Sequence, residues 1–410
     1  MYTENSAPIP LALRDDDSPP YRIDTENLPG SIKAHALKFT GDGGVYFGVW
    51  LVNLLLMVVT LGLFTPFARR RTAKYFYSHT LVAGTPLEFT AGLRRMVVGF
   101  LLFFALYLAY QLAANTGQNR AVALFTIGGL VAAPFLWRSA MRFRLSATRW
   151  RGIRGIFTAT TGEVYRASWP LLGIAACWAV VVLSLSPSVP VAARAIAGVA
   201  AAAVTLLCVV RLEYNYSVLL FTRTEFGGQA GRWKPSYRDF VRIWLAAAGF
   251  FLAIVLSIAL VFALVVGGSI WALASGAAPR GKEAVVLIAI AAMAGFFLML
   301  LASGPARAYR EARMFRLVWS NAGLGRVARF KCELGIWRYV GLRLKNMLLS
   351  MLTFGFYRPF AIASEYRMKT ESVTLHVKGG LDQLVGRMVT QQPGGVGDAL
   401  ADAVGLDLVG

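Results

Sequence analysis

Cysteine, histidine and acidic residues are scarce in this chain of 410 residues. It holds three cysteines and three histidines, and only 21 Asp and Glu against 42 Lys and Arg. So few cysteines exclude a disulfide-stapled secreted module, and their spacing is not that of a zinc or iron–sulfur site. The histidines have no carboxylate or cysteine at ligand spacing; they are His35, His79 and His376. We therefore expect no metal and no cofactor.

Charge of either sign is also sparse. Charged residues make up 15% of the chain and apolar residues 57%, with a mean hydropathy of +0.56. Soluble domains are about half apolar and a quarter charged, so the composition excludes a cytosolic enzyme, a coiled coil and a fully disordered chain. The net charge of +21 could indicate a nucleic-acid partner, or the basic cytoplasmic loops of a membrane protein.

Long uncharged runs are abundant. A helix needs roughly 20 apolar residues to cross a bilayer core of about 30 Å. Six runs predict full transmembrane helices in three hairpins: Met96 to Asn119, Ala121 to Trp137, Ala167 to Ala193, Ala195 to Val210, Ile243 to Pro279 and Ala284 to Ala306. Two further apolar segments, 45–68 and 346–357, either span or re-enter; the second is short for a span.

These two ambiguous segments resemble each other and predict an internal repeat. At a constant offset of 293 they share eight residues: Tyr46/Tyr339, Gly48/Gly341, Asn53/Asn346, Thr60/Thr353, Gly62/Gly355, Pro66/Pro359, Phe67/Phe360 and Ala68/Ala361. Gly and Pro four residues apart break a helix, and the Thr hydroxyl can satisfy the freed backbone groups. The pattern predicts a turn within each segment, or a merely kinked helix. Short strand-like runs and a hairpin around Ala83–Gly84 flank the first copy, and a fainter middle copy lies between 151 and 228.

The predicted fold class is therefore an all-α polytopic membrane protein with small cytoplasmic β-hairpin units and six to eight spans. Its expected divisions follow the chain: a disordered acidic tail (1–33), repeat unit 1 (34–95), a transmembrane hairpin (96–141), repeat unit 2 (142–239) containing the hairpin 167–210, a transmembrane hairpin (240–306), repeat unit 3 (307–388) and a flexible tail (389–410).

The positions of the basic residues decide between the two explanations of the charge. If the end segments re-enter, regions 69–95, 138–166, 211–242 and 307–345 share one face and hold most of the Lys and Arg, whereas the opposite loops hold Arg120, Arg280, Lys282 and, at most, Arg194. Lys and Arg collect in cytoplasmic loops. We therefore expect the basic face and both termini to be cytoplasmic, with no nucleic-acid partner. An eight-span arrangement would place both termini outside.

Three stretches of the chain resemble a known family. The segment from Tyr46 to Thr80, the run WRGIRGIF with GEVYRASWPLL, and LTFGFYRPFAIASEYRMK are similar to the YjgN-type bacterial inner membrane proteins, a domain of unknown function. The resemblance covers nearly the whole chain. It implies an inner-membrane location and no established activity.

Two groups of residues are candidate sites. A polar packing or substrate path could include Asn53, Asn346, Thr60, Thr353, Gly62, Gly355, Pro66 and Pro359, as at the broken helices of transporters; the alternative is interhelical hydrogen bonding by the two asparagines. Anionic lipid headgroups could contact Arg69, Arg70, Arg71, Arg307, Arg310, Arg313 and Arg316. The last four repeat every three residues, as in a voltage sensor, but they follow a span, which favours a helix lying on headgroups.

The sequence shows no Ser-His-Asp order, paired intramembrane carboxylates or nucleophile elbow, so we expect no enzyme. Transport of a small or lipid-like solute is the first hypothesis, although the six runs hold almost no ionisable residues of the kind common in proton-coupled carriers. The alternative is a non-catalytic scaffold whose basic units bind anionic lipid or a partner protein.

Overall fold

The computed structural model describes residues 32–378 except 187, 275–281 and 326, together with Leu381, Val385, Gly386 and Met388; many side chains between 261 and 302 lie outside this description. Nearly all of the expected N-terminal tail and the whole of the tail from 389 also lie outside the described residues.

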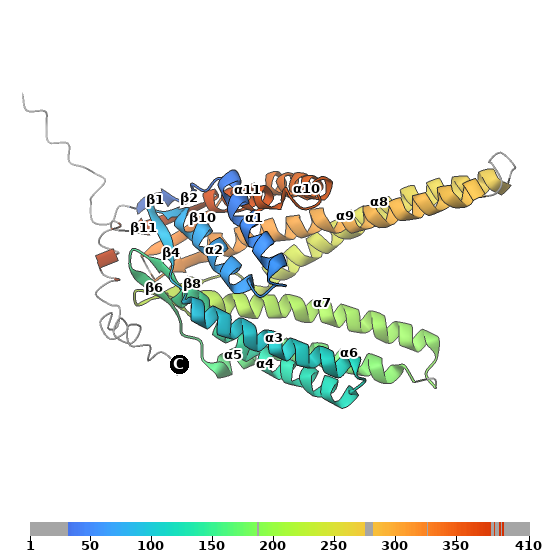
Figure 1. Ribbon diagram of the computed structural model, residues 1–410, viewed down its shortest axis with the longest axis horizontal. Coiled ribbons are helices and arrows are strands. Elements are labelled where there is room, and N and C mark those ends of the chain that lie inside the picture. Colours follow the sequence, from blue (N-terminus) through green and yellow to red (C-terminus); the bar gives the residue numbers. More distant parts are fainter. Residues whose placement is uncertain are drawn as a thin grey trace, which may run out of the picture.

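A single antiparallel sheet of 11 strands lies at one end of the molecule, and helices project from it (Figure 1). Its strands are β1 (Ile32–Ala36), β2 (Lys38–Phe39), β3 (Thr80–Val82), β4 (Thr85–Phe89), β5 (Thr148–Trp150), β6 (Ile153–Phe157), β7 (Thr224–Phe226), β8 (Gln229–Trp233), β9 (Ala322–Leu324), β10 (Ala328–Cys332) and β11 (Val373–Lys378).

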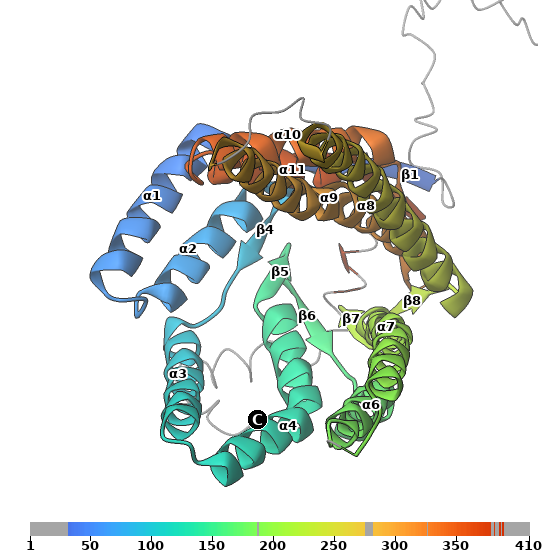
Figure 2. The same ribbon diagram turned by 90° about the vertical axis from the view of Figure 1, so that its right-hand side faces the viewer.

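The helices between β1 and β11 form five units, each inserted between two strands that pair with each other (Figure 2). The units are α1 (Gly43–Val59) with α2 (Thr65–Ser78), α3 (Leu93–Asn115) with α4 (Asn119–Ser146), α5 (Thr161–Ala167) and α6 (Trp169–Ser184) with α7 (Val191–Thr222), α8 (Tyr237–Ala274) with α9 (Lys282–Asn321), and α10 (Ile336–Leu352) with α11 (Arg358–Glu371). Because each unit begins and ends at paired strands, every unit leaves the sheet and returns to it.

The prediction of small separate β-hairpin units is wrong. The strand order is β1-β11-β10-β9-β8-β7-β6-β5-β4-β3-β2, so each hairpin pairs with the next, as β4 does with β5 through Leu87 and Trp150. An isolated hairpin would expose unpaired N–H and C=O groups on both edges. The two end strands are consecutive in the chain, and Leu37 N donates to Val373 O (3.0 Å) where they meet. The sheet is therefore nearly closed and resembles a barrel.

Tight turns join neighbouring units. Both turn residues have positive φ at Ala83 (50°) and Gly84 (77°), at Arg151 (50°) and Gly152 (78°), and at Gly227 (52°) and Gly228 (72°). Positive φ at both central residues is the requirement of a type I′ turn, whose twist suits a two-residue hairpin. The hairpin expected around Ala83–Gly84 is present as β3 and β4, within the larger sheet.

The inside of the sheet is a packed apolar core. One cluster joins buried side chains of distant strands, Ile153 on β6 and Leu375 and Val377 on β11, to Met388 beyond the last strand. Met388 is 1% exposed. Since β6 and β11 are far apart in the strand order, their side chains meet only because the sheet curves round them.

The predicted count of six to eight spans is also wrong. Four described helices are long and apolar enough to cross a membrane: α3, α4, α7 and α8 as far as Leu264. A fifth is reached if α5 and α6, which bend by 43° at Ser168, count as one span. The run from Ala167 to Ala193 fails as one helix because α6 alone has only 16 residues. The run from Ala284 to Ala306 falls in α9, where most side chains lie outside the described residues.

The spanning helices carry their apolar side chains on the outside. Phe103 is 68% exposed, Val199 73% and Leu256 59%. A helix apolar on its exposed faces is suited to lipid rather than to water. This surface supports a membrane location for the helical part of the molecule.

Candidate functional site

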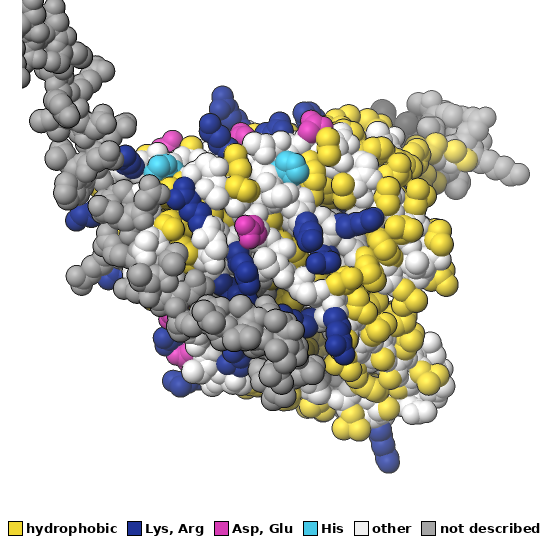
Figure 3. Space-filling model, turned by 60° about the vertical axis from the view of Figure 1, so that its left-hand side comes forward, with side chains coloured by type: hydrophobic (Ala, Val, Ile, Leu, Met, Phe, Trp, Pro, Cys, Tyr) yellow, Lys and Arg dark blue, Asp and Glu magenta, His cyan; other side chains and the backbone are white. Residues whose placement is uncertain are grey.

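Basic side chains gather at the sheet end of the molecule. Figure 3 shows Lys and Arg over that end, with apolar surface beginning where the helices project away. The boundary between the basic and the apolar surface therefore lies where the helices leave the sheet.

The Thr, Gly and Pro candidates build the break between two helices. The Thr60 hydroxyl donates to Leu56 O (2.7 Å) and accepts from Phe64 N (3.0 Å). Thr353 does the same with Leu349 O (2.7 Å) and Tyr357 N (2.9 Å). Gly62 and Gly355 follow with φ of 87° and 92°, and Pro66 and Pro359 are buried in the first turn of α2 and α11. These residues fix the backbone conformation at the break between the two helices of each unit.

The two asparagines lie in buried packing. Asn53 is 3% exposed and Asn346 is 1% exposed. Asn346 Nδ2 donates to Glu365 Oε1 (3.0 Å), Ser364 Oγ (3.1 Å) and Ala361 O (3.3 Å), all on α11. This geometry favours interhelical hydrogen bonding over a substrate path. The structure does not bring the two asparagines together with the arginines in one cavity.

A cavity of about 420 Å³, here called the α9 pocket, lies between the sheet-proximal part of α9, α7 and α10. Its walls combine charged and apolar side chains: Glu213, Arg307, Arg310, Glu311, Met314, Phe315, Val318, Trp319 and Arg343. Ligand sites are typically 300–1,000 Å³ and mostly apolar, with a few convergent polar groups. Size and lining both fit such a site.

One side of the α9 pocket is tied across three helices. Glu213 on α7 accepts from Arg310 Nη1 (3.2 and 3.4 Å) and from Trp244 Nε1 on α8 (2.7 Å). The Arg310 guanidinium also lies 4.3 Å from the centre of the Trp244 ring. A guanidinium on an aromatic face and a carboxylate satisfied by two donors form a rigid wall.

A second ion network includes Glu311 and Arg343, which also line the α9 pocket. Glu311 pairs with Lys369 of α11 and with Arg343 (3.5 Å), and Arg343 also pairs with Glu365 (2.5 Å). Burial alone would raise the pKa of Glu311, but the hydrogen bond from Lys369 and the charges of Lys369 and Arg343 hold it below its ordinary value. Glu311 is therefore ionised at neutral pH.

The arginine series does not act as one stripe. Three residues advance a helix by about 300°, so the side chains drift by about 60° at each step. Arg307 and Arg310 line the α9 pocket, whereas Arg313 and Arg316 are exposed outside it, with Arg313 Nε donating to Tyr309 Oη (3.1 Å). Within the described residues Arg307 forms no ion pair, so it is the uncompensated cation of the pocket.

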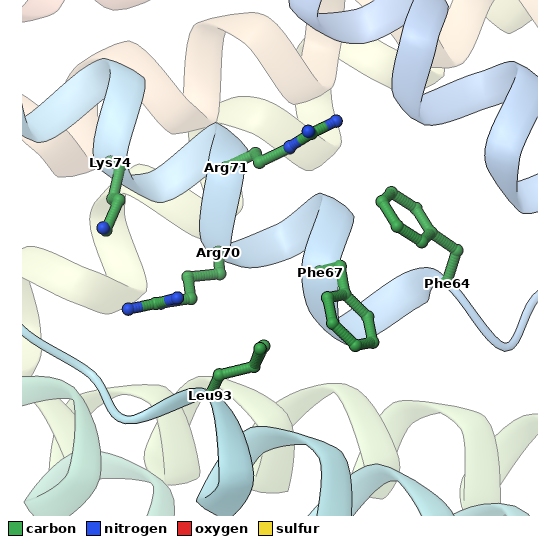
Figure 4. Close-up of a pocket in the computed structure, with 6 residues that line it drawn as sticks. All are labelled: Phe64, Phe67, Arg70, Arg71, Lys74 and Leu93. Carbon is green, nitrogen blue, oxygen red and sulfur yellow. The ribbon is translucent and has the colours of Figure 1, made fainter.

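A smaller cavity of about 220 Å³, here called the α2–α3 groove, lies between the break after α1, α2 and the start of α3. Phe64, Phe67, Arg70, Arg71, Lys74 and Leu93 line it, and Figure 4 shows Arg70 and Phe67 in the space between α2 and Leu93. Arg69, the first of the three predicted lipid contacts on α2, is exposed and does not line the groove.

Sequence reasoning missed Glu213, Trp244 and Lys74 as site residues. Glu213 is the sole acidic residue of α7, which is a usable signal, but its partner Arg310 lies 97 residues away. Nothing local in the sequence marks Trp244. In the described part of the chain no three His, Cys, Asp or Glu side chains are grouped so that they could hold a metal ion.

Comparison with known proteins places the chain in a family. The family model for a bacterial protein of unknown function (DUF898) matches residues 34–403. Proteins called "Inner membrane protein YjgN" are 29% identical over 142 residues in Salmonella typhimurium (strain LT2), 25% over 134 in Escherichia coli O157:H7 and 26% over 129 in Escherichia coli (strain K12). These matches cover 34%, 33% and 32% of this chain and 35%, 34% and 32% of the relatives, about a third of each. No solved structure matches. The chain therefore belongs to the DUF898 family of bacterial proteins, and the relatives it resembles are inner membrane proteins.

Proposed function

We propose that the protein is a non-enzymatic inner membrane protein that binds an anionic, lipid-like molecule in the α9 pocket and moves it across the bilayer. The observation that carries this proposal is the uncompensated Arg307 in a cavity that also presents Trp319 and Phe315. A cation beside aromatic and aliphatic walls suits a molecule with one anionic group and an apolar body.

The position of the α9 pocket supports the same proposal. It lies where the membrane helices meet the basic sheet end, which we infer to be the cytoplasmic face by the positive-inside rule (Figure 3). The inside of the sheet is filled by Ile153, Leu375, Val377 and Met388. A route along the helices therefore fits the described structure better than one through the sheet.

The two short units fit re-entrant segments that repeat one design. α1 and α10 each have 17 residues, α2 and α11 each have 14, and each unit returns to the sheet. A helix of 17 residues is about 25 Å long, less than the bilayer core. In this proposal both termini lie in the cytoplasm.

Lipid translocation in proteoliposomes tests the proposal. Vesicles with fluorescent phosphatidylglycerol in both leaflets are exposed to a membrane-impermeant quencher. We expect faster loss of the protected signal with the protein than without it. Arg307→Gln should slow this loss, and the exposed Arg316→Gln should not. Equal rates in empty vesicles and with the native protein would contradict transport.

A scaffold that binds anionic lipid or a partner protein is the second candidate, and the concentration of Lys and Arg at the sheet end favours it (Figure 3). Tight association with anionic vesicles, without any translocation, would support the scaffold over the transporter.

A further inference from the structure

We propose that the α2–α3 groove is a binding site for the phosphate group of an anionic phospholipid of the cytoplasmic leaflet. This site shares no residue with the α9 pocket, and the inference does not depend on transport.

The groove carries uncompensated positive charge. Arg70, Arg71 and Lys74 contribute three cations, and no acidic residue lines the cavity. Among the described residues none of the three forms an ion pair, although Arg71 lies 5.8 Å from the centre of the Phe64 ring. Arg70 Nε is shielded from solvent and has no hydrogen-bond partner among the described residues. A shielded donor on a charged group without an acceptor is costly. An anion in the groove would supply both the missing charge and the missing acceptor.

The start of α3 adds a second set of donors. Leu93, the first residue of α3, lines the groove, and no side chain caps this helix at Gly92. The first N–H groups of an uncapped helix point outward and carry its positive dipole end, which favours phosphate. Arg70 lies in the space between α2 and Leu93 (Figure 4). The groove therefore has the Arg70 guanidinium in it and the start of α3 at its edge.

The apolar part of the groove fits the rest of a lipid. The Phe64 and Phe67 rings are stacked, with centres 5.2 Å apart, at the start of α2, whose other end leads into β3 of the sheet. From Leu93 the helix α3 runs away from the sheet and exposes Val98, Leu101 and Leu102. A phosphate beside Arg70 would leave acyl chains lying along this surface. That is the orientation of a lipid whose headgroup faces the cytoplasm.

The α10–α11 unit shows that the fold itself does not need these cations. At the offset of 293, the counterparts of Arg69, Arg70 and Arg71 are Ile362, Ala363 and Ser364. The counterpart of Lys74 is Arg367, which donates to Gly41 O (2.7 Å). The same helical pair is thus built with apolar or internally bonded residues, so the groove cations serve something outside the chain.

Native mass spectrometry of the full chain tests this site. The protein is purified in neutral detergent and titrated with phosphatidylglycerol or phosphatidylcholine. We expect the groove of the native protein to retain one phosphatidylglycerol in preference to phosphatidylcholine, in addition to any lipid that the α9 pocket holds. Arg70→Gln with Lys74→Gln should weaken its retention about tenfold or more. The control, Arg69→Gln with Arg316→Gln, removes the same charge outside the groove and should change retention less than about twofold.

A second variant separates charge from shape. Leu93→Trp keeps every cation but fills the groove, and it should also abolish the tightly held lipid in a protein that stays monodisperse. Three results would overturn the proposal: equal retention in the groove variant and native protein, equal loss in groove and control variants, or full retention in Leu93→Trp. None of these variants alters the α9 pocket, so translocation measured on them is independent of the retention result.

Discussion

The α1–α2 and α10–α11 units have the same kind of helix break, but their basic side chains differ in whether they have acidic partners. Both break at a Thr whose hydroxyl bridges the gap, and both turn through a Gly at φ near 90°. In the α10–α11 unit, Arg343 is neutralised by Glu365 and Glu311. In the α1–α2 unit, Arg70 and Lys74 have no described acidic partner. The two units share the local geometry of the helix break but differ in whether their cations have acidic partners. A cation with an acidic partner stabilises the fold, whereas a cation without one is available to a ligand.

The largest loss of stability is expected from placing a cation in the α10–α11 unit at the position that corresponds to Arg70. Ala363, the counterpart of Arg70, is 5% exposed on α11. Ala363→Arg should destabilise the protein by about 3–5 kcal/mol, because it buries a charge without a partner. Thermal unfolding followed by size-exclusion chromatography in detergent measures this. A folded variant of native stability that gained a bound lipid would show that the α10–α11 unit can also accept a cation, and would contradict the difference between the two units.

A smaller loss is expected from removing a partner within the α10–α11 unit. Glu365→Leu removes one acceptor each from Arg343 and Asn346, which keep Glu311 and Ser364 as partners, and it should cost about 1–3 kcal/mol. Arg70→Gln in the first unit should not destabilise the protein, because no described residue pairs with Arg70 and the variant removes its unsatisfied Nε donor. The same thermal assay compares the two variants. Equal destabilisation would show that both cations are structural.

Replacing the glycine at either helix break should lower the stability of the protein by the same amount. Gly62→Ala and Gly355→Ala each place a side chain at φ near 90°, in space that is otherwise open. Strain at positive φ is the sole expected cost, about 1–2 kcal/mol for each. Thermal midpoints of the two variants should therefore agree. A difference larger than the effect itself would mean that the two breaks are not equivalent.

The smallest expected effect is on the pH dependence of the protein's thermal stability. Because the folded protein holds the pKa of Glu311 below its ordinary value, this carboxylate stabilises the fold above its unfolded pKa. That stabilisation is lost as the pH falls through the lowered folded value. Glu311→Gln should therefore show a flatter decline of thermal midpoint from neutral into acidic pH. A decline as steep as that of the native protein would assign the acid sensitivity to other groups.

Local chemistry made part of this structure predictable. The Thr, Gly and Pro spacing predicts the break near Thr60 and Thr353 because each device acts within one helical turn. The Ala-Gly pair predicts the β3–β4 hairpin for the same reason. The candidate lipid contacts Arg70 and Arg307 were identified from sequence alone, but the groove and the pocket around them were not.

The rest depends on contacts between residues far apart in the chain. The joining of hairpins into one sheet rests on pairs such as Phe89 with Thr148, for which no short pattern exists. The run from Ala167 to Ala193 does not form one span because α6 ends at Ser184 after 16 residues. It reaches the length of a span only if α5 is joined to it across the 43° bend at Ser168. The three-residue spacing of Arg307, Arg310, Arg313 and Arg316 resembles that of a voltage sensor, but side chains three residues apart drift by about 60° around a helix and so lie in different surroundings.

We propose that the sheet and its turns lie on the cytoplasmic face and that the loops at the far ends of the helices lie on the other side of the membrane. Single cysteines in a variant lacking Cys177, Cys208 and Cys332 test it, at Lys234 beside β8 and at Gln118 between α3 and α4. A membrane-impermeant maleimide should label Gln118→Cys in spheroplasts, and Lys234→Cys only after the inner membrane is permeabilised. Labelling of Lys234→Cys in intact spheroplasts would contradict the account.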